Sequence, residues 1–170
     1  MSRVPPAPLE GPDAPTEAIA RIHELRGGKV SLLYQTLLNA PDIAAGWCAL
    51  GTAVRWSNSL DDRLRELMTC LVASLAEASY EWCNHEPLAR EHGVTEDELA
   101  SLPDWRSCDS FSDRDRAGLA FAEAVVREAV DDELFERTGE HFSLQERVEI
   151  AATAAYYVSI SRFLNACGVS

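Results

Sequence analysis

Apolar residues recur along this chain at the three- and four-residue spacing of amphipathic helices, and no segment alternates like a half-buried strand. The first predicted helix begins near Thr16 and ends at Gly27, because glycine favours the left-handed conformation that commonly stops a helix. The next two helices are expected over about 31–38 and 41–56, the second opening with a proline that suits a first turn. The pattern therefore predicts an all-α protein that folds as a helical bundle.

Further helix starts are marked by capping motifs. The pattern Ser-x-x-Asp/Glu, followed directly by Arg, occurs three times, beginning at Ser59, Ser112 and Ser143. A related motif pairs Thr95 with Glu98. In such a box the hydroxyl oxygen accepts a backbone N–H of the first turn, and the acid reaches back to the N–H of the capping residue. A helix is expected to begin at each of these four positions.

Two apolar runs without acidic residues, 67–75 and 150–160, are predicted to be helices buried on most sides. The second run is apolar nearly all round, as expected of a central or intersubunit helix. The main loop is expected over 103–111. Residues 1–14 hold four of the eight prolines and should form a flexible Pro-rich arm, which leaves 15–170 as a single all-helical domain.

Composition narrows the classes of partner. The chain has 170 residues, of which 46% are hydrophobic, enough to bury a sizeable core. Its 28 acidic and 15 basic residues give a net charge of −13, which repels nucleic acid and anionic membranes. No segment has the length and apolar content of a signal peptide or a transmembrane helix, so a cytoplasmic protein is expected. The five cysteines show no CxxC spacing, which suits reduced thiols.

Three side chains able to transfer protons fall within one short stretch. Glu81 and His85 are four residues apart and share a helical face. Glu66 lies about five turns earlier, a spacing that lets an antiparallel helix bring it back toward them. A short break between the two helices is expected around residues 77–79. The sequence therefore predicts a Glu66–His85 contact within hydrogen-bond or one-water reach.

The spacing Glu-x11-x-x2-x-x3-His and the tail AAYYVSISRFLNACGV resemble the carboxymuconolactone decarboxylase and alkylhydroperoxidase D-like superfamily. The resemblance covers roughly residues 40–168. In the peroxidase branch the two x positions are a redox pair of cysteines, whereas here they are Ala78 and Glu81. A thiol peroxidase needs one thiolate to attack peroxide and a second thiol to resolve the product. The chain therefore resembles the non-redox branch with the motif YEWxxH, which implies acid–base catalysis by Glu66, Glu81 and His85.

Each of these residues also has a structural interpretation. Without the resemblance, Glu66 near a helix start would be a solvated charge that favours the helix dipole, and His85 would be a satisfied core or surface histidine. Glu81 either transfers a proton itself or only fixes the tautomer of His85. No metal is expected, because di-iron bundles use Glu-x-x-His on two helices, and this chain has Glu-x-x-x-His once.

Four further residues are candidates for substrate binding: Trp47, Tyr80, Trp82 and Arg162. For the three aromatic residues core packing is the alternative, while Arg162, on a helix that looks buried, needs either an ion-pair partner or a substrate carboxylate. Cys83 is two residues from His85 and is expected to face away from the site.

The resemblance implies an enzyme of the decarboxylase type that needs no cofactor, because the carbonyl group of the substrate accepts the electrons of the breaking bond. The same apparatus would serve isomerisation, dehydration, lactone opening or cyclisation of an activated carbonyl compound. The high negative charge argues against a small dianionic lactone, and the four tryptophans favour a larger aromatic substrate. Two alternatives remain: a thiol-dependent antioxidant protein that uses Cys83, and a catalytically silent ligand-binding member. The resemblance also implies trimers or hexamers.

Overall fold

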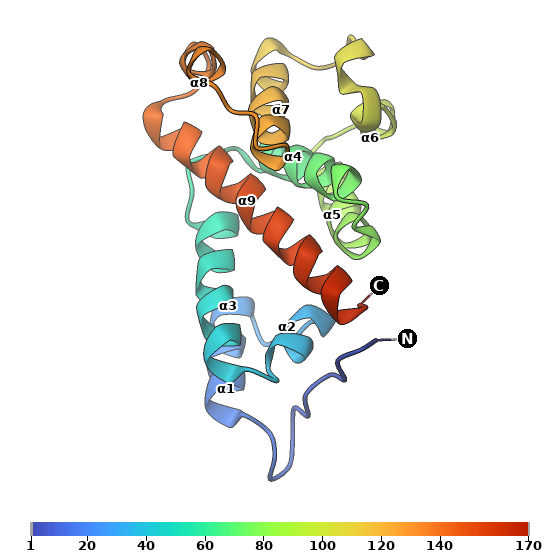
Figure 1. Ribbon diagram of the computed structural model, residues 1–170, viewed down its shortest axis with the longest axis vertical. Coiled ribbons are helices and arrows are strands. Elements are labelled where there is room, and N and C mark those ends of the chain that lie inside the picture. Colours follow the sequence, from blue (N-terminus) through green and yellow to red (C-terminus); the bar gives the residue numbers. More distant parts are fainter. Residues whose placement is uncertain (1, 170) are drawn as a thin grey trace. The chain divides into compact units, whose positions relative to one another are not determined.

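The computed structural model describes residues 2–169, and every regular element in that range is a helix (Figure 1). The predicted all-α fold class is confirmed. The elements, with a 3₁₀ helix labelled η1, are α1 (Thr16–Arg26), α2 (Leu32–Leu37), α3 (Pro41–Trp56), α4 (Asp62–Leu75), α5 (Ser79–Glu91), α6 (Glu96–Ser101), η1 (Leu102–Ser107), α7 (Asp113–Val126), α8 (Asp132–Thr138) and α9 (Leu144–Cys167).

These elements form two compact units, Met1–Ser57 with Phe163–Ser170 and Asn58–Arg162. In the first unit α1 and α2 both pack against α3. Gly27 ends α1 in the left-handed conformation, with φ of 65°, as its sequence position predicts. The predicted division into an arm over 1–14 and one domain over 15–170 stays a prediction.

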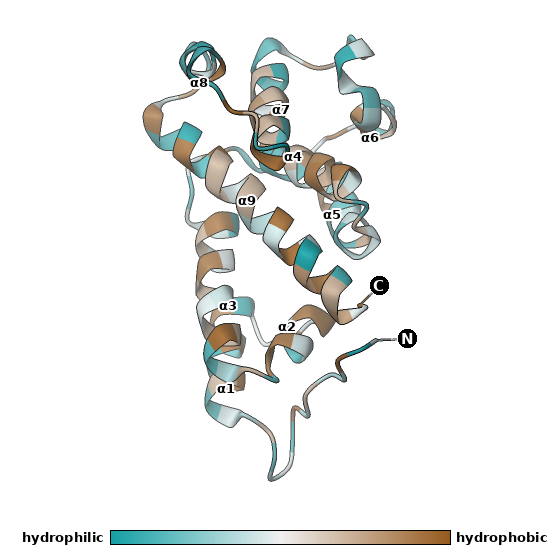
Figure 2. Ribbon diagram, viewed as in Figure 1, coloured by the Kyte–Doolittle hydropathy of each residue, from teal (hydrophilic) through white to brown (hydrophobic). Residues whose placement is uncertain are grey.

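The second unit is built around α4. All ten of its residues from Leu64 to Ala73 are buried, because α4 packs against α5 on one side and α7 on another. Figure 2 shows hydrophobic residues along this helix, as expected of an element that is covered by its neighbours. Residues 76–78 separate α4 from α5, so the predicted break is confirmed. Any polar side chain in the middle of α4 is consequently held in the core of the unit.

Three of the four predicted capping boxes are present. The hydroxyls of Thr95, Ser112 and Ser143 each accept the backbone N–H three residues later, and the acid at that position accepts the N–H of the capping residue. The prediction for Ser59 is wrong. Asp61 caps α4 by accepting the N–H of Leu64, while Ser59 donates through both its backbone N–H and its hydroxyl to Glu149 of α9.

Two of the boxes share one arginine. Arg63, in the first turn of α4, donates to Oε1 of Glu98 at 2.5 Å and to Oδ1 of Asp115 at 2.7 Å. The second oxygen of each carboxylate completes the box at Thr95 or at Ser112. Arg63 therefore ties the beginnings of α4, α6 and α7 together. Both carboxylates are largely buried, with side chains 4% and 11% exposed.

The structure corrects two further expectations. The expected loop over 103–111 is mostly η1, whose Leu102 and Trp105 are buried. The run 150–160 lies in α9 as predicted, but that helix is buried along only one stripe. Its other face is solvent-exposed, including Leu144 at 62% and Val148 at 60%. Alanine occurs on both buried and exposed helix faces, so the alanines of this helix do not reveal from the sequence which face is buried.

Candidate acid–base site

Glu66, Glu81 and His85 meet inside the second unit. Nδ1 of His85 lies 2.6 Å from Oε2 of Glu66, and Nε2 of His85 lies 3.5 Å from Oε2 of Glu81. All three residues are at most 4% exposed. The predicted contact between Glu66 and His85 is confirmed, and the interpretation of Glu66 as a solvated charge is wrong. That these residues are catalytic stays a prediction.

Helix geometry explains why the three side chains converge. The fully buried middle of α4 presents Glu66, and the short connection after Leu75 turns the chain back so that α5 packs against α4. Within α5, Glu81 and His85 are one turn apart and therefore project from the same face. His85 consequently lies between the two carboxylates, with one ring nitrogen directed to each.

A buried arginine adjoins the cluster. Arg65 is buried beside Glu66, with 3.5 Å between its Nη2 and Oε1 of Glu66, and it also pairs with the exposed Asp62 at 2.7 Å. Arg65 therefore contacts one carboxylate of the buried cluster and one at the surface. Groups of this kind, with two acids flanking one imidazole, are suited to general acid–base chemistry.

Sequence reasoning missed Tyr157 of α9 as a neighbour of the site. Its ring is buried and meets the ring of His85 edge to face, with 4.9 Å between centroids. This edge-to-face contact packs the imidazole against α9. Tyr157 is within the tail motif, but it lies too far along the chain from His85 for spacing to reveal the contact. The role of Arg65 was also missed, since adjacent residues on a helix seldom pair.

The structure places the predicted substrate-binding residues differently from one another. Trp82 is half-buried and lines a hollow in the second unit. Tyr80 is also half-buried. Trp47 belongs to α3 in the first unit, where its ring contacts Phe163 at 5.4 Å. Arg162 is exposed, so the expectation that it is buried with a required partner is wrong. Binding roles for these residues stay predictions.

The cysteines offer little support for thiol chemistry at this site. Cys83 is exposed while Glu81 and His85 are buried, which confirms that it faces away from them. Burial, with the neighbouring carboxylates of Glu66 and Glu86 adding to it, raises the pKa of Cys70 to about 12. Hydrogen bonding to Ser101 and Ser110 lowers the pKa of Cys108, which lies beyond η1. All five thiols are free.

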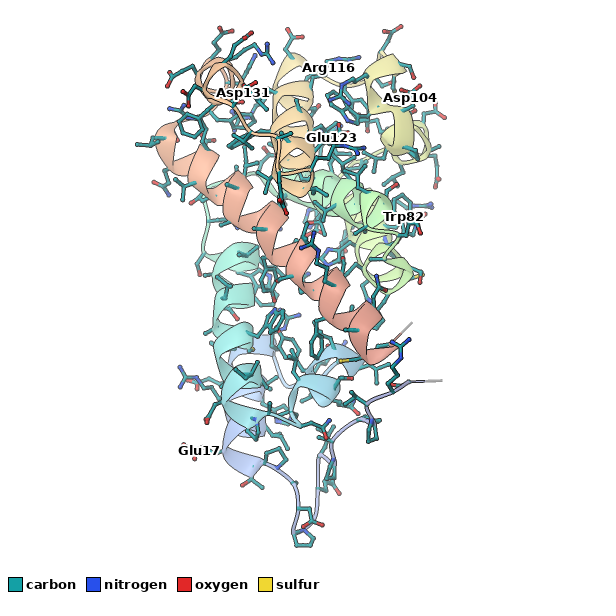
Figure 3. The ribbon with its side chains drawn as sticks, in the orientation of Figure 1. Glu17, Trp82, Asp104, Arg116, Glu123 and Asp131 are labelled. Carbon is teal, nitrogen blue, oxygen red and sulfur yellow. The ribbon has the colours of Figure 1, made fainter. Side chains whose placement is uncertain are left out.

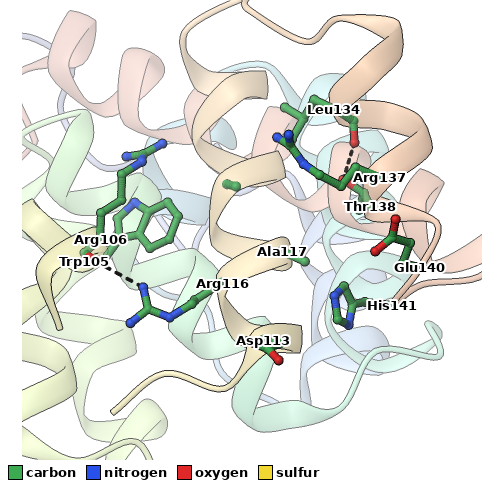
Figure 4. Close-up of a pocket in the computed structure, with 11 residues that line it drawn as sticks. Trp105, Arg106, Asp113, Arg116, Ala117, Leu134, Arg137, Thr138, Glu140 and His141 are labelled. Atoms are coloured by element: carbon green, nitrogen blue, oxygen red, sulfur yellow. Dashed lines mark hydrogen bonds between the residues drawn. The ribbon is translucent and has the colours of Figure 1, made fainter. Parts of the chain in front are cut away.

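A different hollow, of about 420 Å³, lies among η1, α7 and α8 (Figure 4). Its arginines have structural partners: Arg116 donates to the backbone carbonyl of Arg106 at 3.3 Å, and Arg106 pairs with Glu123 at 2.6 Å. Burial alone would raise the pKa of Glu123, but hydrogen bonds from Arg127, Arg106 and Trp105 lower it overall. These contacts hold η1 to α7, and none of the three acid–base residues lines the hollow.

Within the described range, no group of three or more His, Cys, Asp or Glu side chains is arranged to hold a metal ion. No helix there is both long and apolar enough to cross a membrane.

Comparison with known proteins places this geometry in context. Residues 41–124 match the model of the Carboxymuconolactone decarboxylase family. The uncharacterized protein YnjA of Escherichia coli K12 is 29% identical over 122 residues, which are 71% of this chain and 67% of YnjA.

Two solved structures show the same fold at low sequence identity. One is the AhpD core of an uncharacterized peroxidase-related protein from Ralstonia eutropha JMP134, with a TM-score of 0.81 and 24% identity, covering 99% of this chain and 91% of that one. The other is a variant of the debrominase Bmp8 in complex with 2,3,4-tribromopyrrole, with a TM-score of 0.79 and 22% identity, covering 100% of this chain and 93% of that one.

Proposed function

Because residues 41–124 match the model of the Carboxymuconolactone decarboxylase family, we propose that the chain is a cofactor-independent acid–base enzyme. Its substrate is a lactone or another activated carbonyl or carboxylic acid compound, and its reaction is decarboxylation or related enolate chemistry such as isomerisation or cyclisation. The observation that carries the proposal is the buried 2.6 Å bond between His85 and Glu66, with Glu81 at the other nitrogen of the imidazole.

The geometry favours distinct roles for the two glutamates. When Glu66 accepts the N–H of Nδ1, the imidazole is held in the tautomer whose Nε2 carries the lone pair, and that nitrogen faces Glu81. Glu66 is then a positioning residue. In this proposal His85 and Glu81 form the pair that exchanges a proton with the substrate, so Glu81 is assigned proton transfer rather than orientation of His85 alone.

In a decarboxylation, the bond between the carboxylate carbon and its neighbour breaks, and carbon dioxide leaves. The electron pair enters the conjugated carbonyl group as an enolate, to whose oxygen a protonated Glu81 or His85 donates a hydrogen bond. The same proton is then delivered to carbon, which restores the carbonyl group. Isomerisation needs the same two steps, with removal of a C–H proton in place of the loss of carbon dioxide.

Exchange of carbon-bound hydrogen tests this proposal without knowledge of the natural substrate. In heavy water, the protein is expected to catalyse deuterium incorporation next to the carbonyl group of activated ketones, keto acids or lactones, detected by proton NMR. His85→Ala protein provides the background rate. Consumption of hydrogen peroxide that depends on an added thiol, without any exchange, would instead establish the antioxidant alternative. A ligand that binds without either activity would favour the silent member.

A homo-oligomer, trimeric or hexameric, is a second part of the proposal. The exposed face of α9 carries Leu144 and Val148, each about three-fifths exposed, which suits a surface covered by a second copy. Multi-angle light scattering at micromolar concentration is expected to give a multiple of the 18.7 kDa chain mass. Val148→Glu should shift the distribution toward the single chain, because it buries a charge in the contact. A monomer mass for the unmodified protein would contradict the proposal. The cytoplasmic location stays a prediction.

A further inference from the structure

The second unit contains a largely apolar hollow that is lined in part by α5, the helix that carries Glu81 and His85. It has a volume of about 470 Å³ and lies between the α4–α5 connection and the segment formed by α6 and η1. Figure 3 places Trp82 on α5, at the side near α6. The apolar part of the lining is Ala73, Ala78, Trp82, Leu99, Ala100 and Pro103. A space of this volume, walled by small apolar side chains and one indole, fits a flat ring rather than a branched chain.

Two residues that line this hollow are close in sequence to the acid–base residues. Ala78 is three residues before Glu81, and Trp82 is three residues before His85. Trp82 and His85 both lie within α5, so at this spacing they are neighbours on its surface, while Ala78 is the residue that precedes the helix. A ring that rests on Trp82 therefore lies against the helix that carries both groups.

Charge decides what kind of ring the hollow accepts. Among its lining residues Glu77 is the only ionisable one, and the others are apolar apart from two serines. No lysine, arginine or histidine is available there to receive a carboxylate or a phosphate. The chain as a whole carries a charge of −13, which lowers the local concentration of anions and raises that of cations. The indole of Trp82 also attracts cations through its quadrupole.

We propose that this hollow binds the aromatic ring of a substrate that carries a protonated amine, with the ring against Trp82 and the ammonium group beside Glu77. The inference rests on the proposed function, because it assigns the substrate class of the Glu81–His85 pair. It separates this protein from enzymes that act on small dianionic lactones, which the lining of this hollow would repel.

The backbone supplies a matched control for Glu77. This residue follows the end of α4 in the left-handed conformation, with φ of 50°, and Glu128 follows the end of α7 in the same way, with φ of 56°. At both places the next residue donates its N–H back to the last turn of the helix. The two glutamates therefore share backbone conformation and charge, but only Glu77 lines the hollow.

Isothermal titration calorimetry with three indole probes tests the inference. Tryptamine, tryptophol and indole-3-propionate share a ring and differ in charge, so they separate ring binding from charge recognition. The unmodified protein is expected to bind tryptamine about tenfold more tightly than indole-3-propionate, with tryptophol between them. Raising the salt concentration should reduce this preference. Equal or tighter binding of the carboxylate would overturn the inference.

Substitutions test whether the indole probes bind in the hollow. Glu77→Gln is expected to bring tryptamine to the affinity of tryptophol, while Glu128→Gln leaves all three affinities unchanged. Trp82→Ala should weaken every probe about fivefold, since the stacking contact with an aromatic side chain is lost. Ala100→Trp fills the hollow from its exposed rim without removing a contact, so it tests the same point if Trp82→Ala does not fold. Probe affinity that survives both changes would overturn the inference.

The experiments distinguish failure of the binding inference from failure of the proposed function. If the protein binds tryptamine in the hollow but does not exchange carbon-bound hydrogen, the binding inference is supported and the proposed enzyme activity is overturned. Exchange activity without charge-dependent probe binding would leave the enzyme standing and overturn the assigned substrate class. His85→Ala should retain tryptamine binding, because the imidazole does not line the hollow.

Discussion

Replacing His85 with alanine is expected to lower turnover of an exchangeable carbonyl substrate by about a hundredfold or more, the usual contribution of a positioned proton donor or acceptor. The imidazole contacts both carboxylates, so its removal breaks both contacts. Glu66→Gln should have an effect of similar size, because an amide can hold the ring in the wrong tautomer. The measurement is kcat by proton NMR, with circular dichroism to confirm that each variant folds.

The control for this series is Cys83→Ser, which should leave kcat within a few fold of the unmodified protein, because the Cys83 side chain is exposed and the site is buried. If Cys83→Ser abolished activity while Glu66→Gln preserved it, acid–base catalysis by this site would be refuted.

Arg63→Met is expected to lower the free energy of unfolding by about 2–4 kcal/mol. The substitution preserves most of the side-chain volume but leaves Glu98 and Asp115 without their shared cation in a largely buried position. The side chain of Arg63 is itself 29% exposed, so water partly compensates, and the lower half of that range is favoured. Urea denaturation followed by circular dichroism measures the change.

Arg90→Met is the matched control. Arg90 also bridges two carboxylates, Glu86 and Glu96, but its side chain is 44% exposed and that of Glu96 is 69% exposed. Arg90→Met should lower the free energy of unfolding by less than about 1 kcal/mol. Equal effects of the two substitutions would mean that the Arg63 contacts are ordinary surface ion pairs and that the shared capping arrangement contributes nothing special.

Local signals in the sequence predicted much of this fold and of its candidate site. The four-residue spacing of Glu81 and His85 fixes their relation within one helix, and the break before Ser79 makes the return of α5 toward Glu66 foreseeable. The boxes at Thr95 and Ser112 depend on contacts three residues apart, which a sequence displays directly.

Contacts between distant segments could not be predicted in this way. Ser59 stands in the sequence pattern of a helix cap, but its hydroxyl donates a hydrogen bond to Glu149 of α9. Asp61 caps α4 instead. Likewise, Tyr157 reaches His85 only because α9 belongs to the same unit. Neither partner is encoded by a short spacing, so tertiary packing decided the outcome against local preference.

The burial of the acid–base cluster also has an evolutionary consequence. Apolar residues of similar volume in place of a buried charged group are often neutral or stabilising by about 1–4 kcal/mol. Glu66, Glu81 and His85 lie in the core of their unit, where leucine or methionine would pack without any requirement for a partner. Mutation under selection for stability alone would therefore tend to erase the cluster. A lineage that lost the chemistry but kept the fold should show its first substitutions here, inside the protein, before its surface changed noticeably.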